Sequence, residues 1–135
     1  MSICADRPWT GMELIKDPQH IETFDFTEVR IVDGIIRGNV KKNNQYVSDL
    51  GGTCSPFNSQ EDLVRLNFFF TAPRSSGYVD IVLSGLGIKL ANGQVVFRGG
   101  FVALATTARQ DTQANPEIMV TFDPGDTGTG TGMQT

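Results

Sequence analysis

The stretch VDIVLSGLGIKLANGQVVFRGGFVAL, residues 79–104, decides the fold that we predict for this chain. It holds two runs of alternating apolar residues, joined by Ala91-Asn92-Gly93-Gln94. Asn-Gly between such runs is the strongest short-range signal of a β-hairpin, because a type I′ turn needs a positive φ at both central residues. We therefore expect a long antiparallel hairpin in an all-β domain.

The hairpin also carries a register prediction. A two-residue turn at Asn92-Gly93 pairs Leu90 with Val95 and Ile88 with Phe97, so these apolar residues share one face. Extended further, the same register places Ile81 and Leu83 on the opposite face, because side chains alternate with period two. Glycines at 85, 87, 99 and 100 stand where the faces change. We predict a bend or paired bulges there, or else a loop over residues 85–87 between two shorter strands.

Further alternating runs predict strands at 10–16, 20–32, 35–40, 45–50, 63–71, 78–84 and 116–122. The alternation changes parity near residues 26–28, which indicates a bulge or two separate strands there. Asp33-Gly34 predicts a second hairpin turn of the favoured type. No segment has an apolar stripe of helical period, so we expect very little helix.

Short strands with mostly local connections predict a single-domain antiparallel up-and-down β-barrel of about eight strands. The alternative is a β-sandwich. In size and in its long bent hairpin the chain is similar in architecture to lipocalin-like and avidin-like barrels. The aromatic set that avidins use for ligand binding is missing, since the chain has one tryptophan, and the similarity is therefore confined to architecture.

We expect the barrel domain to span residues 1–123. Residues 124–135, PGDTGTGTGMQT, have the composition of a flexible Gly/Thr-rich C-terminal tail. The tail could instead pack against a neighbouring subunit. Residues 51–62 show no periodicity and contain two glycines and a proline, so we expect a loop of the kind that often carries function.

Charge limits the classes of partner. The 135 residues carry a net charge of −4, and the chain has no Lys/Arg cluster beyond Lys41-Lys42. Nucleic acids and anionic membranes both require a basic surface, so we expect neither as partner. No apolar run approaches the roughly 18 residues needed to cross a bilayer.

The two cysteines, Cys4 and Cys54, allow two interpretations. A disulfide would pin the N-terminus and imply an oxidising compartment. Because no export signal is visible in the N-terminal sequence, we favour two free thiols and a cytoplasmic location. There is no Cys/His cluster with zinc spacing, and we expect no metal and no cofactor.

Few residues point to chemistry. His20 is the single histidine, which argues against a multi-histidine metal site, and no spacing of acidic residues forces a catalytic pair. We therefore expect no catalytic residues. Candidate ligand-binding residues are Trp9, Tyr78, Asp80 and Arg98, if the faces that carry them line a cavity.

One aromatic residue stands apart: Phe69 lies on the polar face of the strand at 63–71. It is either an ordinary exposed aromatic or a residue that another subunit or sheet covers.

These features favour a non-enzymatic β-barrel module that binds a small ligand or a partner at the barrel mouth and the 51–62 loop. The first alternative is a structural or assembly protein that homo-oligomerises through strand faces and the C-terminal tail. The second is a barrel enzyme that uses Asp and Tyr residues lining the interior. An interior filled by Phe, Val and Leu side chains would leave no room for a ligand inside.

Overall fold

The computed structural model describes residues 3–17, 21–57, 59, 62–74, 77–109, 117–122 and 126–134. Within these ranges, only the backbone is described for residues in 73–78 and 103–126. This part of the chain consists of strands and turns. The strands are β1 (Pro8–Asp17), β2 (Glu22–Val32), β3 (Ile35–Lys42), β4 (Gln45–Pro56), β5 (Leu63–Arg74), β6 (Gly77–Lys89), β7 (Gln94–Arg109), β8 (Glu117–Phe122) and β9 (Asp126–Gln134). None of these residues forms a helix long and apolar enough to cross a membrane.

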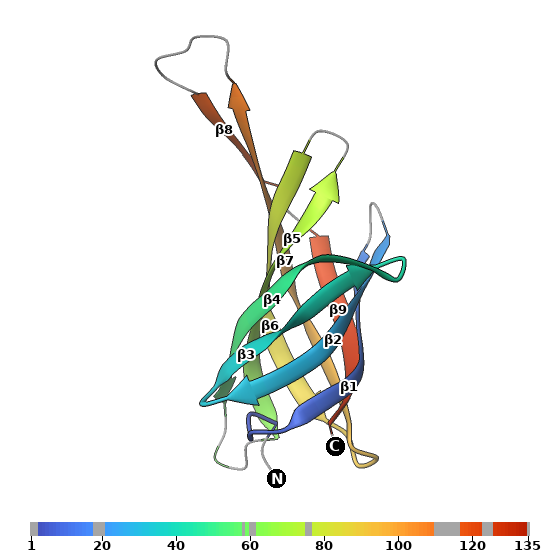
Figure 1. Cartoon of the computed structure of the whole chain (residues 1–135). Helices are drawn as coiled ribbons and strands as arrows, with labels where there is room; N and C mark the ends of the chain where they lie inside the picture. Colours follow the sequence, from blue (N-terminus) through green and yellow to red (C-terminus); the bar gives the residue numbers. More distant parts are fainter. Residues whose placement is uncertain are drawn as a thin grey trace.

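Eight of the strands form a closed antiparallel barrel (Figure 1). Their order is β6-β5-β4-β3-β2-β1-β9-β7, and pairing of β6 with β7 closes the sheet. The remaining strand, β8, pairs with residues 104–109 of β7, on the same edge where β9 pairs with residues 94–101. The predicted all-β up-and-down barrel is confirmed, and closure of the sheet excludes the sandwich.

The C-terminal Gly/Thr segment is part of the barrel. Residues 126–134 form β9 between β1 and β7, which corrects the expectation of a tail for these residues. The threonines and glycines alternate with the period of a strand, and Gly128, Gly130 and Gly132 are buried. A Cβ at Gly130 would lie 1.9 Å from Cζ of Phe97. The glycines therefore leave room for large side chains that cross the barrel from other strands.

The predicted register of the β6–β7 hairpin is wrong by one residue. The turn holds three residues, and Leu90 N–H donates to the carbonyl of Gln94 at 2.7 Å across it. Gly93 takes a φ of +87°, as the last residue of a three-residue hairpin loop often does. Lys89 consequently pairs with Val95. The offset turns Ile88 outward, where it is 47% exposed.

The predicted bulges at the hairpin glycines are also wrong. Pairing of β6 with β7 runs without a register shift from Val79–Ala105 to Lys89–Val95. Gly85 and Gly99 face each other in this ladder, and a Cβ at Gly85 would lie 2.0 Å from the carbonyl oxygen of Arg98. These glycines allow the two backbones to approach closely, and the inner face stays continuous.

Two local predictions are confirmed in β2 and its turn. The β2–β3 register shifts between Thr27 and Arg30, which is the bulge indicated by the change of parity. Asp33 and Gly34 form the predicted turn with φ values of 51° and 76°. The loop expected at 51–62 is shorter than predicted, because β4 continues to Pro56 and pairs with β5.

Phenylalanine side chains fill the centre of the barrel. Six of them are at most 4% exposed: Phe24, Phe26, Phe68, Phe70, Phe97 and Phe101. Phe24 lies 5.0 Å from Phe70 between ring centroids, and Phe68 lies 5.0 Å from Phe97. Phe26 bridges the two pairs, at 5.5 Å from Phe70 and 5.3 Å from Phe68. Aromatic pairs at these separations are favourable beyond their buried area, so the interior is a packed core.

Candidate functional site

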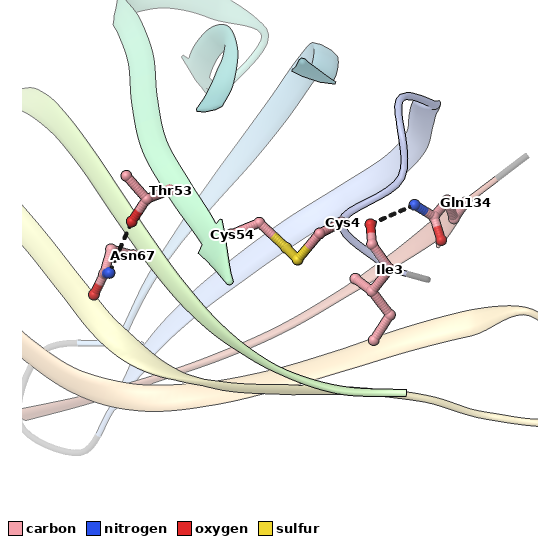
Figure 2. The surroundings of a disulfide bond; sticks show 6 residues. All are labelled: Ile3, Cys4, Thr53, Cys54, Asn67 and Gln134. Carbon is pink, nitrogen blue, oxygen red and sulfur yellow. Dashed lines mark hydrogen bonds between the residues drawn. A yellow bond between two sulfur atoms is a disulfide. The ribbon is translucent and has the colours of Figure 1, made fainter. Parts of the chain in front are cut away.

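The N-terminal segment lies at the lower end of the barrel in the view of Figure 1. Ile3 is fully buried there, and Gln134 Nε2 donates to its carbonyl oxygen at 2.7 Å (Figure 2). Cys4 forms a disulfide with Cys54 of β4, with 5.5 Å between the Cα atoms. The expectation of two free thiols is therefore wrong. Sequence spacing could not reveal the bond, because the barrel brings together cysteines that are 50 residues apart.

A charged group lies near the opposite end. Lys16 is 2% exposed, lies 3.9 Å from a Glu22 carboxylate oxygen and sits over the ring of Phe101. Lys42 also pairs with Glu22, and its ammonium lies over the ring of Phe24. Glu22 therefore links two lysines from β1 and β3 above the phenylalanine core.

Replacing Glu22 by glutamine should weaken this end of the barrel. The change removes the negative charge beside the buried Lys16 and the partly buried Lys42. We expect the free energy of unfolding to fall by about 1–2 kcal/mol, which is between the values typical of exposed and buried pairs. Urea denaturation measures the change, with the exposed neighbour Thr23→Ala as control. Equal stability of Glu22→Gln and the unmodified protein would contradict the assigned role.

The structure does not bring the four predicted ligand-binding residues together. Trp9 is 5% exposed and packs inside the closed lower end, where a Cβ at Gly132 would lie 3.0 Å from its ring. Asp80 and Arg98 are exposed on the outer face. They lie about 20 Å apart along the sheet, since Asp80 pairs with Leu104, six residues from Arg98. The side chain of Tyr78 lies outside the described residues.

An apolar surface covers the outside of β5, β6 and β7. We call it the outer apolar face, and its five residues are between 38% and 47% exposed: Phe69, Val82, Leu86, Ile88 and Val102. Val82 pairs directly with Phe69 on one side and with Val102 on the other, so these three side chains form one row across three strands. Exposed apolar residues that are contiguous in this way mark interaction surfaces more often than scattered ones do.

The sequence analysis did not predict most of the outer apolar face, because the predicted register of the β6–β7 hairpin was wrong by one residue. Alternation counted from the buried Ile81 and Leu83 would have placed Val82, Leu86 and Ile88 outside. Phe69 was identified as an aromatic on a polar face, and the structure places it 44% exposed at one end of the row.

A two-stranded arm projects from the upper end of the barrel (Figure 1). Pairing of β7 with β6 ends at Ala105, and among the described residues 106–109 pair only with β8. An isolated two-stranded hairpin is marginally stable in water, and its free edges are ready to pair with another strand. The arm is therefore a second exposed feature of the barrel, beside the outer apolar face.

The described residues contain no group of three or more His, Cys, Asp or Glu side chains that could hold a metal ion. His20 lies outside the described residues. No family model, curated protein or solved structure matches the chain.

Proposed function

We propose that the protein is a non-enzymatic assembly module that associates with a second copy of itself through the outer apolar face. The observation that carries this proposal is the contrast between the two sides of β5, β6 and β7. Their inner side is filled by the phenylalanine core, whereas their outer side exposes five large apolar residues. We therefore place the binding surface on the outside of the barrel.

The charges on this face suit a copy related by a two-fold axis. Outward residues follow one another along β6 as Asp80, Val82, Ser84 and Leu86. A two-fold axis that crosses β6 at right angles, midway between Val82 and Ser84, places Asp80 of one copy over Leu86 of the other copy. Leu86 pairs with Arg98 on β7, so Asp80 then lies beside Arg98 of the other copy. Arg98 has no ion pair among the described residues. Each copy then supplies a carboxylate for the arginine of the other, as an isologous interface requires.

A small ligand at the barrel mouth stays a prediction from the sequence. The packed phenylalanines would restrict such a ligand to a rim of the barrel, and the predicted 51–62 loop begins at the end where Cys54 is bonded to Cys4 and Ile3 is buried. We place this hypothesis second because the outer face offers more exposed apolar surface than the rim residues do.

Val82→Asp should weaken self-association by roughly tenfold or more, since a charge would be buried at the centre of the interface. Sedimentation velocity over a range of concentrations measures the change. Ile15→Asp is the matched control, because Ile15 is also 38% exposed but lies on β1, outside the outer apolar face. Equal association of the two variants would contradict the proposal.

A charge reversal tests the orientation of the two copies. Asp80→Arg should weaken association, and adding Arg98→Asp should restore it in part, because the reversed charges attract across the axis. Both variants are compared by sedimentation, with circular dichroism to verify folding. No recovery in the double variant would contradict the two-fold arrangement.

A further inference from the structure

A separate groove lies on the outside of the β2–β3 hairpin. Its volume is about 600 Å³, which is within the range of small-molecule sites. Its lining includes Glu28, Arg30, Val32, Asp33, Ile35, Arg37 and Asn39. None of them belongs to the outer apolar face, so the groove is independent of the proposed assembly surface.

Two arginines form the centre of the groove. Arg30 and Arg37 are directly paired across the strands and both are exposed. Neither has an ion pair among the described residues. Like charges directly opposite each other in a sheet are destabilising. An anion bound between Arg30 and Arg37 would relieve this repulsion. The planar guanidinium fork binds carboxylates through two parallel hydrogen bonds.

The carboxylate of Glu28, at one end of the groove, already accepts a hydrogen bond from Asn39. Glu28 sits at the β2 bulge with a φ of 54°, and Asn39 Nδ2 donates to its Oε2 at 2.7 Å. A non-glycine residue in this conformation is strained and often marks a functional site. Asp33 lies at the other end of the groove, in the turn. Carboxylates at both ends repel a polyanion, so the groove suits a ligand with a single negative charge.

An apolar pair completes the site. Val32 and Ile35 pair with each other, and each lies two residues from the arginine on its own strand, toward the turn. Val32 is 50% exposed and Ile35 is 48% exposed. The groove thus places a cationic pair beside an apolar pair on one surface. A ligand that satisfies both has a charged head and an apolar body.

We propose that the β2–β3 groove binds a small amphipathic carboxylate, with the carboxylate between Arg30 and Arg37 and the apolar body over Val32 and Ile35. The head and the body are both required. A small inorganic anion lacks the apolar contact, and an alcohol of the same length lacks the charge.

Titration of the full chain with octanoate, followed by amide NMR, tests the proposal. Shifts should be confined to residues 28–39 and saturate at millimolar concentration. Octanol and acetate should each bind at least roughly tenfold more weakly than octanoate, because each lacks one half of the ligand. Arg30→Gln and Arg37→Gln should each weaken octanoate binding roughly tenfold. Arg65→Gln, an exposed arginine on β5, is the matched control and should bind octanoate as the unmodified protein does.

Three results would overturn the proposal. They are the absence of octanoate shifts up to about 10 mM, shifts centred outside residues 28–39, and octanol binding as tightly as octanoate. The ligand comparison uses the unmodified protein, so it decides the question even where an arginine variant fails to fold.

Discussion

Removal of the Cys4–Cys54 disulfide is expected to lower the free energy of unfolding by about 4 kcal/mol. The estimate follows from the chain entropy of an unfolded loop of 50 residues. The bond holds the N-terminal segment over the lower end of the barrel, where Ile3 is buried and accepts a hydrogen bond from Gln134. Guanidinium denaturation with and without reductant measures the loss.

A double variant, Cys4→Ala with Cys54→Ala, is the control for the reductant. It should be as unstable as the reduced protein and insensitive to further reduction. Two reactive thiols in the folded, unreduced protein would contradict the assignment. A disulfide of this kind is typical of proteins in oxidising compartments, which argues against the cytoplasmic location favoured by the sequence.

Gly130→Ala is expected to cost about 3 kcal/mol of stability, at the upper end of what an added methyl group costs in a packed core. The new Cβ would lie 1.9 Å from the ring of Phe97, which is 1% exposed and in contact with Phe68. Thermal and urea denaturation measure the effect. Thr129→Ala, on the outward side of the same strand, should change stability by no more than about 0.5 kcal/mol.

A double-mutant cycle separates this clash from a general weakness of β9. Phe97→Leu removes the ring and leaves space for the added methyl group. The double variant Gly130→Ala, Phe97→Leu should therefore be more stable than the sum of the single effects predicts, by at least about 1 kcal/mol. Strict additivity would mean that Gly130 and Phe97 do not meet inside the barrel.

The class of fold could be predicted from local patterns. Alternation along residues 63–71, the turn signal Asp33-Gly34 and the absence of a helical stripe all report on backbone geometry within a few residues, and the structure agrees with them. The bulge near Glu28 was visible for the same reason, because it changes the parity of the alternation.

Predictions failed where the answer depends on contacts between distant residues. The composition of 126–134 is that of a tail, and these glycines are core positions only because large side chains of other strands lie against them, such as Phe97 at Gly130 and Leu83 at Gly128. The Cys4–Cys54 bond depends on the closure of the barrel. The hairpin register depends on one extra turn residue at 91–93, which reverses every side chain that follows.

The most direct test of the account is the mass of the unmodified protein in solution, measured by light scattering over a range of concentrations. We expect a species of twice the 14.7 kDa chain mass that dissociates on dilution. A dimer interface of about 1,000 Å² or more is needed for stable association. A monomer at every concentration, up to about 1 mM, would contradict self-association through the outer apolar face.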